Sequence, residues 1–407
     1  MNATPETETG QRPRPWAAIV AATVLVLPLG SIYAFSVFLK PLEDLLAASR
    51  SELATVFGVA AIFYTIGMNL GPRLFPYLGV GAFFTLSALL SASGIALSAV
   101  AQTFLELLLG YGALFGLGGG LGYVAAQQSI NLVGFKRTGL VNGYIVALLP
   151  CGSMLAAPVC SFGIFVFGVR GTLWGLAGVI LASGLLTVAL AQFAGMRLSA
   201  IPTTGTNRNA RPGRPAEFWK LFFVFLLAAA AGLMVLSQAA GIVAAYGGTA
   251  AVATFATTGV TGAIAAARLA GGVLSDRFAI PKVMAGAQLA ALGGGIGLTL
   301  WPSPEVSIAA LIAIGMGYGI ISGATAAAIA SYWPKQLFGL IAGRVYIAWC
   351  LAAVSLPILA ARIFDLTGGY ATAFLIGGAC NLAAALVALS LPAQKRAPEV
   401  SIAVTTK

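Results

Sequence analysis

The chain has 407 residues, of which 59% are hydrophobic and only 8% are charged. A soluble protein carries about 25% charged residues, so this composition excludes soluble domains and indicates an integral membrane protein. The net charge of +11 does not indicate nucleic-acid binding, because the basic residues lie between apolar runs and form no single basic stripe. We therefore expect the lipid bilayer, and no nucleic acid, around this chain.

The residue types that build metal and catalytic sites are scarce. Histidine is absent, and the four cysteines lie singly within apolar runs, whereas thiolate and imidazole metal sites need clustered ligands. The apolar runs contain no nucleophile with a base, and there is no Walker sequence (GxxxxGK[ST]) for ATP. We expect no metal, no other cofactor, no catalytic residues and no enzyme activity.

Twelve apolar runs are long enough to cross a membrane, since a spanning helix needs about 20 apolar residues. In chain order they cover residues 16–39, 51–72, 79–101, 104–131, 139–167, 171–195, 218–246, 249–274, 282–301, 306–332, 338–362 and 370–391. The first run is too long for a signal-peptide core, so we expect it to remain as a helix.

The charges between these runs predict the topology. Most basic residues fall on the side of the N-terminus, and the opposite side holds only Lys40, Arg50, Arg170 and Arg362. Because positive charge marks the cytoplasmic side, we expect a multi-pass protein of the inner (plasma) membrane with both termini in the cytoplasm.

A hydrophilic stretch in the middle of the chain separates two sets of six runs. We expect a cytoplasmic tail at 1–15, a six-helix bundle at 16–195, a cytoplasmic linker at 196–217, a second six-helix bundle at 218–391 and a cytoplasmic tail at 392–407. The glycines of GLGGG (116–120) recur as GMGYG (315–319) at an offset near 200 residues. Repeated halves are typical of secondary transporters with a site between them.

Arg268 is the only basic residue well inside a predicted span. Arginine at this depth costs about 2.5–3.5 kcal/mol and needs an anion or a wet cavity. Small or polar residues share its helix face, namely Thr254, Thr258, Thr261, Ala265, Gly272 and Ser275. A guanidinium suits bidentate binding of a carboxylate, so we predict that Arg268 binds substrate. The alternative is that it snorkels to the cytoplasmic surface, about 9 Å away.

Aromatic residues in four different spans are candidates for the lining of a central cavity. Tyr33, Tyr123, Tyr318 and Trp349 could each close over a small acid, although tyrosines in membrane helices also serve as packing anchors. Asp276 and Arg277 follow the eighth run, where an acid beside helix ends could hold the cytoplasmic side closed. We treat them as a candidate cytoplasmic gate, with a solvated loop pair as the alternative.

Several sequences resemble a known family. GVLSDRFAIPK (272–282) resembles the loop motif of the major facilitator superfamily, although its first-half copy has Pro76 and Tyr77 in place of the acid and the arginine. GSIYAFSVFLKP (30–41), GLGGGLGY (116–123) and FDLTGGY (364–370) resemble the oxalate/formate antiporter and monocarboxylate transporter families. The resemblance implies an all-α fold of two six-helix bundles. It also implies that Arg268 binds the substrate carboxylate and that Tyr33, Tyr123 and Tyr318 line the cavity.

In the oxalate exchanger of that family a second cation stands at the position that matches Trp349 here. One cation suits one carboxylate, because a dianion would keep an uncompensated charge. We therefore predict a monomeric secondary transporter that moves a small organic anion by alternating access, with a monocarboxylate such as lactate or pyruvate as substrate and a proton or a counter-anion as the coupled species. The alternatives are a dicarboxylate/formate-type exchanger, a facilitator-fold exporter of another substrate, and a carboxylate receptor.

Overall fold

The computed structural model describes residues 14–198 and 214–393, and within these ranges the regular structure is helical throughout. Residues 1–13, 199–213 and 394–407 lie outside the described ranges, and they include most of the predicted tails at 1–15 and 392–407 and of the predicted linker at 196–217. Their boundaries therefore stay predictions, whereas the two sets of helices can be compared with the sequence directly.

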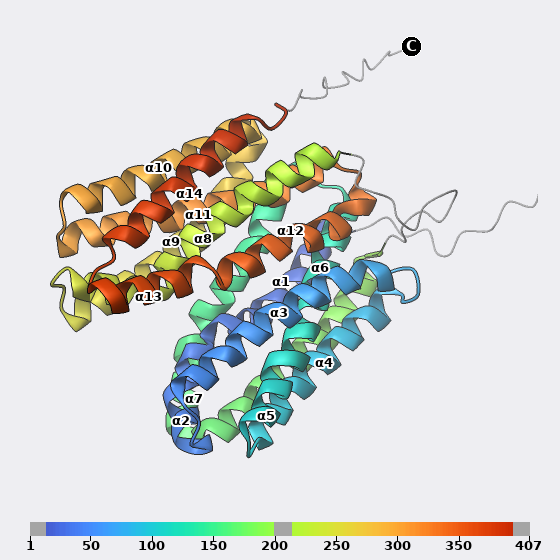
Figure 1. The fold of residues 1–407 in the computed structure, drawn as a ribbon. Coiled ribbons are helices and arrows are strands. Elements are labelled where there is room, and N and C mark those ends of the chain that lie inside the picture. The colour runs from blue at the N-terminus through green and yellow to red at the C-terminus, as the bar shows by residue number, and fades with distance from the viewer. Residues whose placement is uncertain (1–13, 199–213, 394–407) are drawn as a thin grey trace, which may run out of the picture.

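The first half of the chain forms the lower bundle in Figure 1. Its elements are α1 (Pro15–Leu29), η1 (Gly30–Phe38), α2 (Leu39–Leu46), α3 (Arg50–Leu74), α4 (Val80–Val100), α5 (Phe104–Leu107), η2 (Leu108–Phe115), α6 (Gly116–Val133) and α7 (Thr138–Phe193).

The second half forms the upper bundle, shown in yellow to red in Figure 1. Its elements are α8 (Pro215–Ala245), α9 (Ala250–Arg277), α10 (Ile280–Leu300), α11 (Pro304–Tyr332), η3 (Lys335–Leu337), α12 (Phe338–Ala353), α13 (Leu356–Thr367) and α14 (Ala371–Leu389).

Eleven helical stretches within the described residues are long and apolar enough to cross a membrane. The stretch α7 is 56 residues long, which is about 84 Å at 1.5 Å per residue and far more than one bilayer crossing requires. Its backbone leaves the helical conformation at Gly168, with φ 70° and ψ 177°, a region that is essentially restricted to glycine. Counted on either side of Gly168, α7 supplies two of the twelve predicted spans.

The first and fourth spans change helical type along their length. Residues Gly30–Phe38 form a 3₁₀-helix between α1 and α2, and Leu108–Phe115 form a π-helix before α6. The two segments are joined by the Tyr111 hydroxyl, which donates to the Ser31 carbonyl oxygen at 3.2 Å. Irregular turns of this kind inside helices often accompany functional sites, and η1 carries Tyr33.

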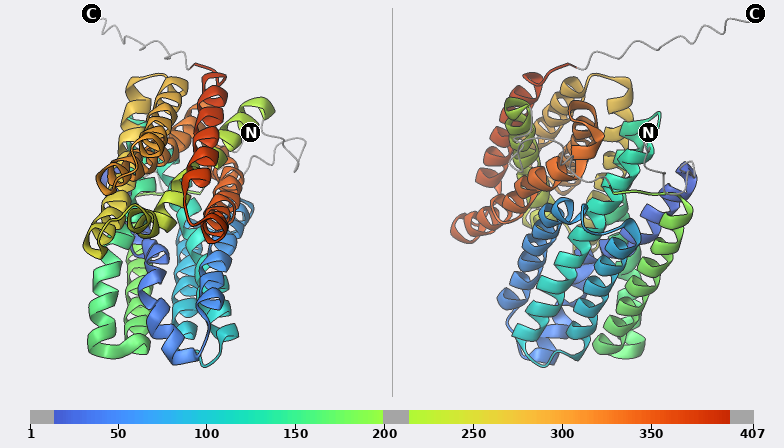
Figure 2. Two further views of the ribbon diagram at one scale, coloured as in Figure 1. Left: turned by 60° about the vertical axis from the view of Figure 1, so that its left-hand side comes forward. Right: turned by 90° about the vertical axis from the view of Figure 1, so that its right-hand side faces the viewer.

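The two bundles meet at the end of the molecule where the described ranges begin and end, and they spread apart toward α2 and α13 (Figures 1 and 2). Backbone contact at glycines permits this close approach. A Cβ atom at Gly272 of α9 would collide with the carbonyl oxygen of Gly139 in α7. On the other side of the interface, the Asn69 side chain of α3 donates to the Gly343 carbonyl of α12 at 2.7 Å.

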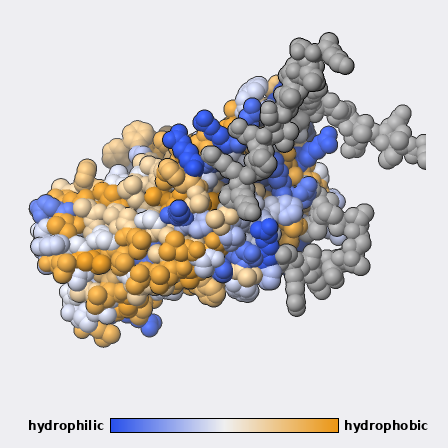
Figure 3. Space-filling view, turned by 90° about the horizontal axis from the view of Figure 1, so that it is seen from above, coloured by the Kyte–Doolittle hydropathy of each residue, from blue (hydrophilic) through white to orange (hydrophobic). Residues whose placement is uncertain are grey.

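The surface has the polarity of a membrane protein. Figure 3 shows hydrophobic side chains over most of one face and hydrophilic ones gathered near the end where the bundles meet. Large apolar side chains such as Phe165 and Leu366 are 87% exposed, which is favourable only against lipid. The chain is a multi-pass membrane protein.

The glycine contact between α7 and α9 predicts a steric penalty. Gly272→Ala should lower the stability of the protein by about 1–3 kcal/mol, because the new methyl group must displace the backbone at Gly139. Gly286→Ala on α10 is the matched control, since its Cβ would meet no atom within 4 Å. Melting temperatures of the two purified variants in detergent measure the difference, and equal values would contradict the close packing.

Candidate functional site

A cavity of about 600 Å³ lies between the two bundles. Its wall combines residues of η1, α3 and α7 with residues of α8, α9 and α12. On α9 the lining residues are Thr257, Thr261, Ile264 and Arg268, which share one helix face. The sequence predicts Thr258 on the face of Arg268, but Thr257 lines the cavity and the neighbouring Thr258 does not. The face that lines the cavity is therefore turned slightly from the predicted one.

Arg268 lines the cavity one turn of α9 before Gly272, where the two bundles are in contact. The arginine residue is only 5% exposed. One terminal nitrogen (Nη1) donates to the carbonyl oxygen of Val146 at 3.1 Å, and the other (Nη2) donates to the Tyr318 hydroxyl at 3.0 Å. The guanidinium carbon also lies 5.4 Å from the centre of the Tyr318 ring. The side chain thus turns into the interior and does not snorkel to the surface.

Pro150 explains why the Val146 carbonyl is available. In a regular helix this oxygen would accept from the N–H of the residue four positions later, but proline has no N–H. Pro150 lies inside α7 and lines the same cavity. A proline in the first bundle therefore creates the acceptor that binds an arginine of the second bundle.

The charge of Arg268 has no ionic partner within residues 14–198 and 214–393, where the ion pairs are those of Lys40 with Glu43 and Asp44. Its Nε atom is buried and has no hydrogen-bond partner there. A buried cation without an anion is costly in an apolar environment. The cavity therefore offers one positive charge that no anion neutralises and an Nε–H donor that has no partner within the described residues.

Tyr33 and Trp349 both line the cavity. Their rings pack edge to face, with centroids 6.2 Å apart and an interplanar angle of 85°. Tyr33 comes from η1 in the first bundle and Trp349 from α12 in the second. This aromatic pair therefore spans the boundary between the bundles beside Arg268.

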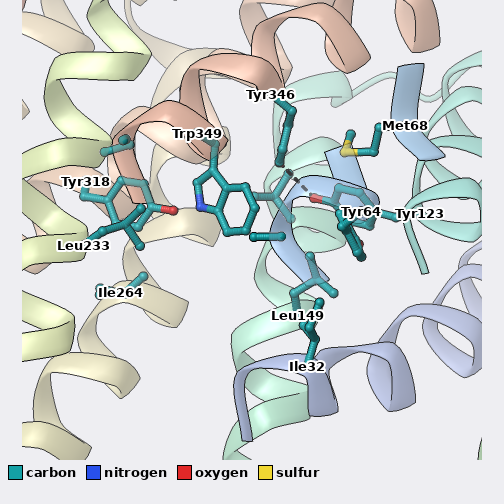
Figure 4. Close-up of a cluster of buried hydrophobic side chains, with 14 of the residues drawn as sticks. Ile32, Tyr64, Met68, Tyr123, Leu149, Leu233, Ile264, Tyr318, Tyr346 and Trp349 are labelled. Atoms are coloured by element: carbon teal, nitrogen blue, oxygen red, sulfur yellow. Dashed lines mark hydrogen bonds between the residues drawn. The ribbon is translucent and has the colours of Figure 1, made fainter. Parts of the chain in front are cut away.

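Tyr123 and Tyr318 are not among the residues that line the cavity. Tyr318 lies behind Arg268 and binds its guanidinium. Tyr123 is fully buried, and its hydroxyl pairs with the Tyr346 hydroxyl at 3.0 Å. Figure 4 shows Trp349 between Tyr318 on one side and Tyr64 and Tyr123 on the other.

Asp276 connects the bundles at the closed end. Its Oδ1 accepts from the Gly139 N–H at 2.8 Å and its Oδ2 from the Leu140 N–H at 2.7 Å. These amides belong to the first turn of α7, where a carboxylate is favoured by the helix dipole. Arg277 is exposed and no hydrogen bond or ion pair of its side chain is found within the described ranges. The two members of the candidate gate therefore have different surroundings.

Gln128 makes a further polar contact between the bundles. Its Oε1 accepts from the Gly339 N–H at 2.7 Å and its Nε2 donates to the Lys335 carbonyl at 3.0 Å. Sequence reasoning missed the apolar cavity residues Leu233 and Ile264. Leucine and isoleucine in an apolar run carry no signal that distinguishes a cavity wall from a lipid-facing surface.

Comparison with known proteins now identifies the fold. The Major Facilitator Superfamily model matches residues 218–406. The solved structure of the proton:xylose symporter XylE aligns with a TM-score of 0.72 at 16% identity and covers 94% of this chain and 96% of its own. The fucose transporter FucP in its outward conformation aligns with a TM-score of 0.66 at 16% identity over 94% and 100%. The second half of the chain thus matches the superfamily's model, and the whole chain has the fold of the solved facilitators.

Within this superfamily the chain has relatives of low identity. The uncharacterized MFS-type transporter YhjX of Escherichia coli (strain K12) is 25% identical over 56% of this chain and 57% of its own length. Monocarboxylate transporter 1 of Bos taurus is 26% identical over 41% and 33%. Monocarboxylate transporter 11 of Homo sapiens is 24% identical over 95% and 87%. The match thus spans little more than half of the length of YhjX and a third of the length of monocarboxylate transporter 1. The superfamily and its fold are those of transporters and not of enzymes.

The hydrogen bond between Tyr318 and Arg268 can be tested by removing one oxygen. Tyr318→Phe should destabilise the protein by about 1–3 kcal/mol, because it leaves a further donor of a buried charge unpaired. Tyr332→Phe also removes one hydroxyl, but that hydroxyl binds only the Pro392 carbonyl, so its loss should be smaller. Thermal unfolding in detergent compares the two variants, and an equal loss would show that the Tyr318 hydroxyl is not a special partner of Arg268.

Proposed function

We propose that this protein is a secondary transporter of a small organic anion and that the carboxylate of its substrate binds Arg268. One observation carries the proposal: a 5% exposed guanidinium lines a cavity between the bundles and has no anionic partner within the described residues. A carboxylate would neutralise the charge and accept from the unpaired Nε. The relatives named monocarboxylate transporters support the same substrate class.

A monocarboxylate, of the kind represented by lactate and pyruvate, fits better than a dicarboxylate. Arg268 is the one cationic residue among those that line the cavity within the described ranges. A second carboxylate would enter a wall made largely of apolar and aromatic side chains, where an unpaired charge is strongly disfavoured. This argues against the exchange of dianions such as oxalate.

Sugar transport is the other function that solved proteins of this fold suggest, because XylE is a proton:xylose symporter and FucP is a fucose:proton symporter. At 15–17% identity these likenesses concern the fold alone. The described cavity wall contains hydroxyl groups but no Asn, Gln or carboxylate side chain, whereas a sugar needs many well-placed polar partners. The wall therefore favours an anion with an apolar body over a polyol.

We propose alternating access as the mechanism. With the described chain ends in the cytoplasm, as the distribution of basic residues predicts, the cavity faces outward and the contacts of Asp276 and Gly272 lie on the cytoplasmic side. Arg268 binds the Val146 carbonyl across the boundary between the bundles. An entering carboxylate would compete for the same guanidinium, so substrate binding would change an interaction that stabilises this conformation.

The coupled species in this proposal is a proton or a counter-anion. The residues that line the cavity include no histidine and no acid within the described ranges. A coupled proton would therefore have to travel with the substrate carboxylate. If no proton is coupled, a second anion would have to bind Arg268 and be carried in the opposite direction.

Uptake into proteoliposomes tests the proposal. We expect labelled lactate and pyruvate to enter with wild-type protein, faster than oxalate, and Arg268→Gln to lower kcat/KM at least about tenfold through loss of a charge-assisted hydrogen bond. Arg362→Gln removes an exposed arginine of α13 and should have no such effect. The series is run with and without an inward proton gradient, and stimulation by the gradient would indicate proton coupling.

Two results would contradict the proposal. If no carboxylate enters, or if Arg268→Gln transports as well as wild type, Arg268 is not the anion site. If oxalate enters faster than the monocarboxylates and depends on Arg268, the protein is an anion transporter of the dicarboxylate type.

A further inference from the structure

The polarity of the cavity wall changes with distance from Arg268. This change restricts which acids could bind at the site that the proposed function assigns to Arg268. On α9 the wall extends from Arg268 to Thr257, eleven residues or about 16 Å along the helix. A three-carbon acid spans two carbon–carbon bonds of about 1.5 Å each. Such an acid, with its carboxylate on Arg268, would fill only a small part of this length.

Apart from the hydroxyl of Tyr33, which interacts with the guanidinium, the side chains that line the cavity next to Arg268 include three large apolar ones. Ile264 lies one turn from Arg268 on α9, and Leu233 of α8 and Trp349 of α12 line the same cavity. Figure 4 shows Leu233 and Ile264 beside Tyr318, which binds Arg268, with Trp349 next to them. The atoms that follow a bound carboxylate would therefore contact hydrocarbon and an indole ring.

Apart from that of Tyr33, the hydroxyl groups on α8, α9 and η1 lie farther from Arg268 along the cavity, with Thr261 seven residues before it on α9. Ser237 follows Leu233 by one turn of α8, and Thr257 precedes Ile264 by about two turns of α9. On η1, Ser36 is three residues beyond Tyr33 in the direction of α2. With Tyr33 as the exception, the hydroxyl groups on α8, α9 and η1 thus lie toward the wide end of the cavity.

We infer that the transported acid is a monocarboxylate with a bulky apolar body, either an aromatic ring or a branched hydrocarbon chain, and that Trp349 selects this body. An apolar body would remove the faces of Leu233, Ile264 and Trp349 from water, and its affinity grows with the apolar area covered. The indole already packs edge to face against Tyr33 at 6.2 Å, and a ring in the substrate extends this arrangement in the geometry that aromatic groups prefer.

The test rests on the proposed function and compares acids of different bodies with the whole protein in proteoliposomes. Labelled phenylacetate, 4-methyl-2-oxopentanoate and lactate are supplied separately to wild type, Trp349→Ala, Trp349→Phe and Arg268→Gln. For wild type we expect kcat/KM for at least one of the two larger acids to exceed that for lactate tenfold or more. Arg268→Gln should lower the transport of all the acids.

Trp349→Ala should reduce the preference for the larger acid about tenfold, and Trp349→Phe, which keeps a ring, should retain most of it. Trp301→Ala is the matched control, because Trp301 is 66% exposed at the end of α10, and its preference should equal that of wild type. The ratio of kcat/KM for the larger acids to kcat/KM for lactate in wild type tests the inference even if Trp349→Ala fails to fold.

The outcomes separate this inference from the proposed function. Transport that depends on Arg268 but favours lactate, or is equal for the three acids, overturns the inference and leaves the anion transporter standing. An unchanged preference in folded Trp349→Ala overturns the selective role of Trp349. Absence of any Arg268-dependent acid transport overturns both.

Discussion

A single positive charge buried between two apolar bundles is the constraint on which this site depends. The guanidinium of Arg268 is tolerated because Val146 and Tyr318 accept two of its hydrogen bonds, and Val146 is free to do so because Pro150 has no N–H. Neither acceptor carries a negative charge, so the desolvation cost is only partly offset. In the proposed function, an entering anion would supply the missing charge, and the unpaired cation would make the site selective for anions.

The same arginine lies between the open and the closed part of the interface. Beyond it, in the direction of the closed end, α7 and α9 meet through Gly139 and Gly272, and Asp276 binds the first amides of α7. On its other side the bundles part and leave the cavity. Contacts that need no side-chain rearrangement, such as glycine backbones and a carboxylate on a helix end, can separate and form again as the bundles rock.

The sequence contains enough information for the bundles and for the arginine, and less for the side-chain directions. Apolar runs predict spans because the bilayer requires a minimum length, and Arg268 stands out because a charge in such a run is rare. The direction of Tyr123 depends on helix rotation and on Tyr346, which lies 223 residues away in the chain. Asp276 binds backbone N–H groups, which every residue except proline has and which therefore leave no sequence signal.

The most direct test of the central claim is the melting temperature of the purified protein with and without a saturating monocarboxylate. A ligand that binds only the folded state raises the melting temperature. We expect lactate, pyruvate or phenylacetate to raise that of wild type and to leave that of Arg268→Gln unchanged at the same concentration and ionic strength, with chloride as the control anion. An equal rise in both proteins, or a rise with chloride as large as that with the acids, would contradict the assignment of Arg268 as the carboxylate site.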